Sequence, residues 1–220
     1  MSYADEVFIR NCRDILENGV WDTDRTVRPH WEDDGAPAHT VKKFGIVNRY
    51  DLSEEFPLLT LRRTYWKTAV DELLWIWQQK SNNIHDLRGH IWDQWADETG
   101  SIGKAYGYQL GVRHQYPEGE FDQVDRVLYD LKHNPASRRI LTNIYTFEDL
   151  HEMALYPCAY SMTFNVSGNT LNAPQPAQSG YARGEQLERR AVRRARAYVR
   201  EGVRAAGGRA GARHRRRAHL

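Results

Sequence analysis

Cys158, which follows Pro157 and precedes a predicted strand, is the first candidate for covalent chemistry in this sequence. A cysteine attacks carbon as the thiolate, which needs neighbouring positive charge or a hydrogen-bond donor. A single cysteine is more often a small buried apolar residue, so the residue alone leaves both interpretations open. Cys12 is the only other thiol, and two distant cysteines form neither a disulfide framework nor a paired metal spacing. This usage is typical of an intracellular, reducing compartment.

Two adjacent arginines, Arg138 and Arg139, follow the helix-breaking pair Asn134-Pro135 and precede another predicted strand. Planar guanidinium groups bind phosphate oxygens two at a time, so this spacing suits a doubly charged phosphate. A solvated surface pair would have the same spacing and stays an alternative. Arg28, in a long polar segment over residues 20–38, is a further phosphate candidate or another surface charge.

Glu72 is a charge inside an otherwise apolar helical stretch, Asp71-Glu72-Leu73-Leu74-Trp75. A carboxylate among apolar side chains has a raised pKa and can relay protons. The alternative is that Glu72 faces solvent beside Asp71. The pattern favours neither interpretation.

Three aromatic residues could bind a flat heterocycle. Trp92 and Trp95 lie three residues apart, so on a helix they share a face, although core packing is the more frequent reason for this spacing. Tyr106 lies in Gly103-Lys104-Ala105-Tyr106-Gly107, where the glycines let backbone approach a ligand closely. Taken singly, none of these signals identifies a reaction.

Hydrophobic periodicity predicts the elements that must position these side chains. Ala69, Leu73, Leu74 and Trp77 define the apolar face of one helix, which Thr64 is expected to cap. The Ser167-Gly168-Asn169 turn predicts a hairpin after the last strand. The predicted helices cover residues 3–17, 64–79 and 122–133, and the predicted strands cover residues 41–52, 140–145 and 160–166.

The net charge of +2 is the sum of two unlike parts. From Pro174 to Leu220, thirteen arginines against three glutamates give +10, and the preceding 173 residues therefore carry −8. All seven Trp and all six Phe precede Pro174. The first part has the composition of a globular domain with one core, and no apolar run approaches the length of a membrane span. Residues 1–6 lack the features of a signal peptide, so we expect a cytoplasmic protein.

Taken in order, these segments resemble thymidylate synthases. The resemblance runs from about residue 5 to Ala173. It rests on Gly35-Ala36-Pro37-Ala38-His39-Thr40, Phe56-Pro57-Leu58-Leu59-Thr60, Asp71-Glu72-Leu73-Leu74-Trp75, Ile91-Trp92-Asp93-Gln94-Trp95, Tyr106-Gly107, Asp122-Gln123-Val124-Asp125, Ser137-Arg138-Arg139-Ile140 and Ala154-Leu155-Tyr156-Pro157-Cys158.

The resemblance implies reductive methylation of dUMP by methylenetetrahydrofolate, a co-substrate, to dTMP and dihydrofolate, with no metal. It implies that Cys158 adds to C6 of the uracil ring, that Glu72 organises proton transfer and that Tyr106 assists removal of the C5 proton. It assigns phosphate binding to Arg28, Arg138 and Arg139, and folate contacts to Trp92, Trp95 and Arg62.

The fold that the resemblance implies is α/β, a mixed sheet backed by helices, in a homodimer whose subunits stack through their sheets. The adjacent arginines Arg138 and Arg139 then reach the site of the partner subunit. Ala159 stands where the family usually has His, and Arg62 replaces a common Lys. The first of these is typical of a bacterial and phage branch.

The largest departure begins at Pro174, where the family continues with a Gln-Arg-Ser-x-Asp segment. Arg, Ala and Gly are what GC-rich DNA encodes when it is read out of frame. Read from the second base of each codon, residues 174–188 permit Leu-Asn-Gln-Arg-Ser-Gln-Asp, followed by further residues in the family's order. We therefore expect residues 1–173 to be the N-terminal two-thirds of a catalytic domain, with its C-terminal part missing, and residues 174–220 to be a disordered tail produced by a frameshift.

Two alternatives remain open at this point. A deoxycytidylate hydroxymethylase shares the nucleophile, and the residue that discriminates uracil from cytosine falls in the lost segment. Under the second alternative, the +10 tail is a nucleic-acid-binding arm, although it lacks Lys and interleaved aromatic residues. The codon explanation makes a nucleic-acid partner the weaker hypothesis.

Overall fold

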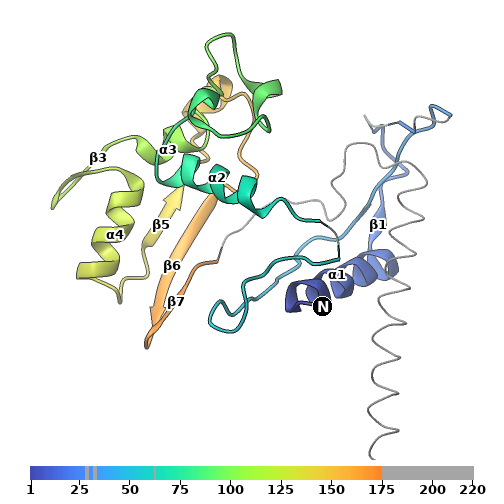
Figure 1. Cartoon of the computed structure of the whole chain (residues 1–220), viewed down its shortest axis with the longest axis horizontal. Helices are drawn as coiled ribbons and strands as arrows, with labels where there is room; N and C mark the ends of the chain where they lie inside the picture. The colour runs from blue at the N-terminus through green and yellow to red at the C-terminus, as the bar shows by residue number, and fades with distance from the viewer. Residues whose placement is uncertain (28–29, 32–33, 62, 175–220) are drawn as a thin grey trace, which may run out of the picture. The chain divides into compact units, whose positions relative to one another are not determined.

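The structure, a computed structural model, describes residues 1–27, 30–31, 34–61 and 63–174. These residues divide into an N-terminal unit, residues 1–64, and a second unit, residues 65–174 (Figure 1). Of the predicted tail, residues 174–220, Pro174 is described, and residues 175–220 lie outside the described residues.

The N-terminal unit is organised around helix α1, Tyr3–Asn18. Ser2 caps the helix by accepting a hydrogen bond from the backbone N–H of Asp5, and the Asp5 carboxylate accepts from Ser2 N in return. The same buried carboxylate accepts from the backbone N–H of Thr60 at 2.8 Å. Burial alone raises the pKa of Asp5, but the hydrogen bonds from Thr60 and its neighbours outweigh it and the pKa is lowered.

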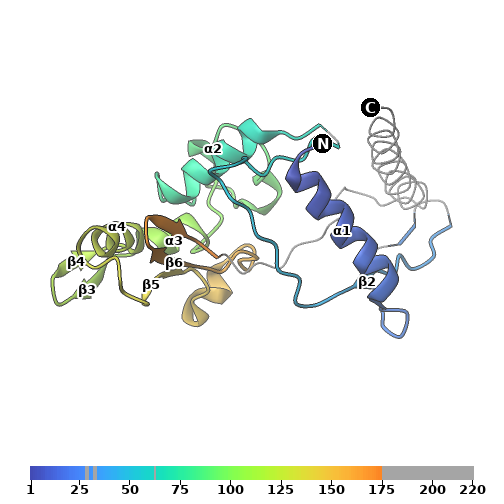
Figure 2. The ribbon, with the colours of Figure 1, turned by 90° about the horizontal axis from the view of Figure 1, so that it is seen from below.

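Strands β1, Val20–Trp21, and β2, Val41–Lys42, pair antiparallel beside α1 (Figure 2). The predicted strand over residues 41–52 is therefore wrong beyond Lys42. Asp22, just after β1, accepts hydrogen bonds from the backbone and the hydroxyl of Thr40 at 2.7 and 2.9 Å, which ties β1 to the residue before β2. Within the described part of the chain, no strand pairs with residues 43–52, so the alternating pattern there joins no sheet.

The second unit begins with helix α2, Trp66–Trp77. Thr64 does not cap it, contrary to prediction: the cap position is taken by Tyr65, which makes no side-chain cap hydrogen bond, and the Thr64 hydroxyl donates to the carbonyl of Leu59. The predicted apolar face is only partly buried: Trp77 packs against the core, whereas Leu73 and Leu74 are 55% and 44% exposed. The helix buries Trp75 and Ile76 instead.

A three-stranded antiparallel sheet follows the order β5-β6-β7, as Figure 1 shows. Strand β5, Ile140–Asn143, pairs with β6, Ser161–Ser167, so that Ile140 faces Phe164 and Asn143 faces Ser161. Strand β7, Thr170–Asn172, returns from β6 through the predicted hairpin turn. Helix α4, Gln123–His133, contacts β5.

Hydrogen bonds made by Asp122 and Gln123 fix the first turn of helix α4. Asp122 caps it by accepting from the backbone N–H of Asp125, and the same carboxylate pairs with Lys80 just beyond α2. Gln123 donates to the carbonyls of Gln109 and Asn143 at 2.8 and 2.9 Å. These contacts connect α4 to the segment after α2, to helix α3, Gly107–Gly111, and to β5.

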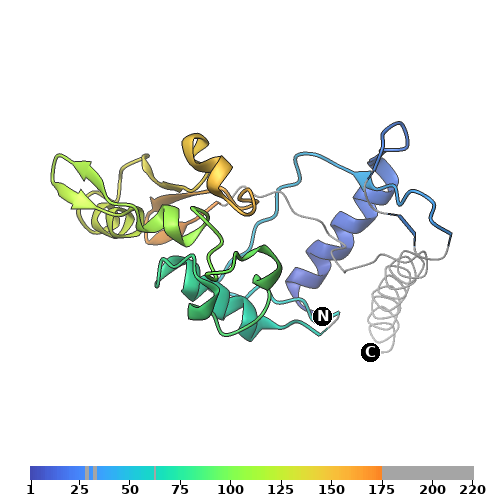
Figure 3. The same ribbon diagram turned by 90° about the horizontal axis from the view of Figure 1, so that it is seen from above.

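Shorter elements complete the second unit. Helix α3, Gly107–Gly111, contacts α2, and the hairpin of β3, His114–Tyr116, and β4, Gly119–Phe121, contacts α4. Figure 3 shows this hairpin in yellow-green beside α4. Three 3-10 helices are η1, Ile84–Asp86, η2, Asp93–Trp95, and η3, Phe147–Glu152. The core between these elements includes Trp75, Trp92, Ile102, Tyr106, Leu110 and Met153.

Candidate active site

Glu72 is half-buried on α2 and accepts a hydrogen bond from the indole N–H of Trp92, with 2.8 Å between Oε1 and Nε1. The interpretation of Glu72 as a purely solvent-facing residue is therefore wrong. Trp92 is only 7% exposed, so its single donor is satisfied inside the core by a carboxylate. The contact joins residues twenty positions apart and fixes one Glu72 oxygen.

Trp92 is the centre of an aromatic cluster. Its ring centroid lies 5.2 Å from that of Tyr106, 5.4 Å from that of Trp95 and 6.1 Å from that of Trp75. These are ordinary edge and tilted packing distances. Trp92 and Trp95 were expected to share the face of a helix, but Trp92 precedes η2 and Trp95 ends it. Their rings meet because this single 3-10 turn is tight.

Tyr106 connects the aromatic cluster to Cys158. Its hydroxyl accepts a hydrogen bond from the backbone N–H of Cys158 at 3.3 Å, at the long end of the normal range. Tyr106 has φ 45° and ψ −103°, a conformation that side chains rarely adopt and that costs of order 1–3 kcal/mol. A Cβ on the next residue, Gly107, would lie 2.1 Å from the carbonyl oxygen of Ser81. The glycine is therefore required for the close approach of two backbones.

A polar network surrounds the Tyr106 turn, residues 103–107. Lys104 Nζ lies 3.0 Å from Asp149 and 2.8 Å from Glu152, both on η3. Gln109, 4% exposed, donates to the Lys104 carbonyl and to Asp149 at 3.0 and 2.8 Å. The hydrogen bonds from Gln109 and Lys104 hold the pKa of Asp149 below its usual range, and Glu152 and Asp149 raise the pKa of Lys104.

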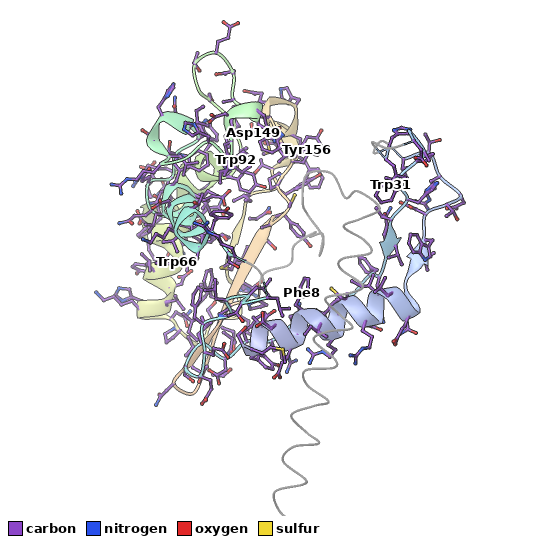
Figure 4. The ribbon with its side chains drawn as sticks, turned by 45° about the vertical axis from the view of Figure 1, so that its right-hand side comes forward. Phe8, Trp31, Trp66, Trp92, Asp149 and Tyr156 are labelled. Carbon is purple, nitrogen blue, oxygen red and sulfur yellow. The ribbon has the colours of Figure 1, made fainter. Side chains whose placement is uncertain are left out.

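Lys104, Gln109 and Asp149 have no role predicted from the sequence. The only signal was the position of Lys104 and Gln109 on either side of Tyr106, since Asp149 is forty or more residues away. Figure 4 shows the side chains of Trp92 and Asp149 in the same region of the second unit, with Trp66 apart from both.

Arg138 and Arg139 are exposed and stand directly before β5. The register places them beyond the pair Ile140 and Phe164, whereas Cys158 precedes the opposite end of the ladder, where Asn143 faces Ser161. Three residues of strand separate those ends by about 10 Å. The two arginines therefore do not join the series of contacts that connects Glu72 to Cys158.

Two predicted site residues, Arg28 and Arg62, lie outside the described residues. Among the residues that are described, no group of three or more His, Cys, Asp or Glu side chains is arranged to hold a metal ion. Within the same part of the chain, no helix is long and apolar enough to cross a bilayer.

The arrangement therefore connects four predicted site residues by direct contacts. The carboxylate of Glu72 binds the indole of Trp92, the indole packs on the ring of Tyr106, and the phenol binds the backbone of Cys158. Cys158, Tyr106 and Glu72 carry a thiol, a phenol and a carboxylate, groups that can supply a nucleophile and exchange protons, and the contact at Cys158 is made by its backbone N–H. Trp95 extends the aromatic surface beside them.

Comparisons with known proteins point to one family. The family model described as thymidylate synthase matches residues 6–180. The chain is 45% identical over 183 residues to a thymidylate synthase of Bacillus licheniformis, covering 81% of this chain and 65% of the relative. It is 44% identical to the thymidylate synthase of Bacillus phage phi3T, with the same coverage of both chains.

A solved structure gives the same result. The thermostable thymidylate synthase A from Bacillus subtilis superimposes with a TM-score of 0.76 at 42% identity, covering 83% of this chain and 67% of that one. The expected α/β fold class is thereby confirmed. The chain spans about 65% of the length of the curated relatives that it matches. From the extent of the family match, the sequence identity and the shared fold, the chain belongs to the thymidylate synthase family.

Proposed function

We propose that this chain derives from an enzyme that methylates dUMP to dTMP, with methylenetetrahydrofolate as co-substrate and dihydrofolate as co-product. The observation that carries the proposal is the continuous series of contacts from Glu72 through Trp92 and Tyr106 to Cys158. In a chain of this family, that series joins a nucleophile to groups that handle protons.

In the proposed reaction, the Cys158 thiolate adds to C6 of the uracil ring and makes C5 nucleophilic. C5 then attacks the one-carbon unit of the folate, which later also supplies the hydride. The phenol of Tyr106 assists loss of the C5 proton, and Glu72, with one oxygen held by Trp92, organises the proton transfers. Trp92, Trp95 and Arg62 contact the folate in this proposal.

Phosphate binding is proposed for Arg28, Arg138 and Arg139. The position of Arg138 and Arg139 at the far end of the β5–β6 ladder from Cys158 supports their use in the site of a second subunit, within a homodimer. Cytoplasmic localisation and the absence of a metal requirement belong to the same proposal.

We further propose that residues 174–220 are encoded in a shifted frame. The ordered series of family residues that the shifted codons permit supports this. The in-frame protein, in which the original frame continues after Ala173, would regain the segments that bind the pyrimidine and the sugar. The 220-residue chain is expected to form little or no dTMP. Resequencing the DNA around Ala173 tests this proposal, and an intact frame encoding the Arg-rich tail would contradict it.

A second candidate activity is hydroxymethylation of dCMP by the same nucleophile. The shifted frame permits Asn at the position that discriminates the two bases, which favours uracil. The test is to incubate the in-frame protein with methylenetetrahydrofolate and either dUMP or dCMP. We expect dihydrofolate to form, seen by its absorbance, with dUMP only, whereas a hydroxymethylated product from dCMP would support the second candidate.

Nucleic-acid binding by the +10 tail is the remaining candidate. It predicts salt-dependent DNA binding that disappears when residues 174–220 are removed. The enzyme proposal predicts that removing residues 174–220 abolishes no specific function, because under that proposal the tail has none.

A further inference from the structure

The Tyr106 turn is strained, and the Tyr106 side chain must still reach the backbone of Cys158. Tyr106 and Gly103 both have positive φ, 45° and 72°. The hydroxyl of Tyr106 nevertheless contacts the backbone N–H of Cys158, fifty-two residues further along the chain. A strained conformation persists only where surrounding contacts hold it.

One side of the turn is held by the end of α2. Gly107 lies so close to Ser81 that a Cβ would overlap its carbonyl oxygen. This contact fixes the residue after Tyr106. It does not involve the segment between η3 and Cys158.

The other side is held by η3 through a short antiparallel bridge at Gly103 and Met153. The backbone N–H of Lys104 donates to the Glu152 carbonyl at 3.0 Å, and Ala154 N donates to the Ile102 carbonyl at 3.2 Å. A Cβ on Gly103 would lie 1.9 Å from the Glu152 carbonyl oxygen. The bridge ends four residues before Cys158.

The Lys104 side chain adds a charged restraint to this bridge. Its ammonium group contacts Asp149 and Glu152, which are three residues apart on η3 and would repel one another without a cation between them. The contact with Asp149 is partly shielded, since the Lys104 and Asp149 side chains are 31% and 22% exposed, whereas the contact with Glu152, 45% exposed, is more open to solvent.

Gln109 completes the arrangement on the Tyr106 side. One amide group donates to both the Lys104 carbonyl and the Asp149 carboxylate, and Thr146 donates to its Oε1 at 2.8 Å. The residues on both sides of Tyr106 are thus connected to the helix that leads to Cys158. We call Lys104, Gln109, Asp149 and Glu152 the η3 clasp.

We propose that Lys104 is a positioning residue: through the η3 clasp it holds the Tyr106 turn so that the phenol meets the backbone of Cys158. The proposal rests on the proposed function for its significance in catalysis, because there Tyr106 and Cys158 act on the same pyrimidine. Its structural content, the dependence of the Tyr106–Cys158 contact on Lys104, is independent of any substrate.

The test is hydrogen exchange at the Cys158 amide, resolved by residue, in the full 220-residue chain without substrate. Lys104→Met keeps the length of the side chain and removes the charge. We expect Cys158 exchange to rise about tenfold in this variant and to stay within about threefold of the parent in Lys104→Arg.

A double-mutant cycle separates positioning from general support. Tyr106→Phe removes the acceptor and should itself accelerate exchange at Cys158. If Lys104 acts through Tyr106, then Lys104→Met added to Tyr106→Phe changes exchange by no more than about twofold. Full additivity of the two effects would overturn the proposal.

Arg126→Met is the matched control, because Arg126 also binds two carboxylates, Glu118 and Asp130, but lies away from the turn. We expect it to leave Cys158 exchange unchanged. The positioning role would be contradicted if Arg126→Met accelerated Cys158 exchange as much as Lys104→Met does. It would also be contradicted if Lys104→Met removed as much protection from α4 amides as from Cys158, or if the Cys158 amide were unprotected in the parent. None of these results depends on dUMP binding, so a failed activity assay would not be mistaken for failure of the clasp.

Discussion

The indole N–H of Trp92 donates to the carboxylate of Glu72 at 2.8 Å, and the same indole ring packs against Tyr106. One side chain thus connects the Glu72 carboxylate to the phenol that contacts Cys158. Trp92 is buried, so its ring position is set by the core. The proposed site is therefore continuous with the hydrophobic core of the second unit.

Trp92→Phe keeps an aromatic ring but removes the donor to Glu72. We expect the free energy of unfolding to fall by about 2 kcal/mol, because a half-buried carboxylate loses its partner and the smaller ring leaves space. Denaturant unfolding followed by circular dichroism measures this. Trp66→Phe is the control, since Trp66 is 50% exposed and its change should fall within about 0.5 kcal/mol. Equal losses of unfolding free energy in Trp92→Phe and Trp66→Phe would mean that the buried contact between Trp92 and Glu72 does not stabilise the fold.

Gly107→Ala should destabilise the second unit by at least about 2 kcal/mol, because the added Cβ meets the Ser81 carbonyl oxygen. Gly89→Ala provides the comparison, since the atom nearest to its added Cβ is a Thr68 methyl carbon at 3.9 Å. Thermal unfolding of both variants distinguishes them. A Gly107→Ala protein as stable as Gly89→Ala would show that the two backbones are not in close contact.

Cys12 should react slowly with alkylating agents in the folded chain. Burial raises its pKa to about 11, so about one thiol in a thousand is ionised at pH 8. The alkylation rate, followed by mass spectrometry of the Cys12 peptide, should rise with pH until about 11. In the urea-unfolded chain, the alkylation rate should stop rising at a pH of about 8.5, the ordinary pKa of a cysteine thiol.

The raised pKa also fixes the sign of a stability effect. The folded state favours the neutral thiol, so this contribution is fully present below the pKa of the unfolded chain and is lost as the pH rises towards 11. Cys12→Ser should therefore weaken the loss of stability in alkali. Identical alkylation profiles for the folded and urea-unfolded chains would contradict the burial of this thiol.

Much of the secondary structure could be predicted from sequence because it is set locally. The helix at α4 begins at Gln123 with Asp122 as its cap, within one residue of the prediction, and the β6–β7 hairpin follows its Gly168 turn. Both depend on side chains within a few positions. Thr64 was wrong as a cap because helix α2 begins at Trp66, so that Tyr65 takes the cap position, and the Thr64 hydroxyl donates to the Leu59 carbonyl.

The geometry of the site depended on contacts that the sequence does not display. Single residues such as Glu72 and Cys158 could be named, but the Trp92 and Tyr106 side chains that connect them come from a 3-10 turn and a strained loop. The Lys104 contacts span more than forty residues, so no local pattern indicates them. The exposed Leu73 and Leu74 show the same limit, because periodicity identifies an apolar face but not what covers it.

Cys158 is the proposed nucleophile of a dUMP-methylating enzyme. The most direct measurement is the kcat for dTMP formation by the in-frame protein and by its Cys158→Ser variant, with Cys12→Ser as the matched control. We predict that Cys158→Ser lowers kcat by several decades because covalent addition opens the reaction, and that Cys12→Ser leaves kcat within about twofold. Turnover retained in Cys158→Ser would contradict the account.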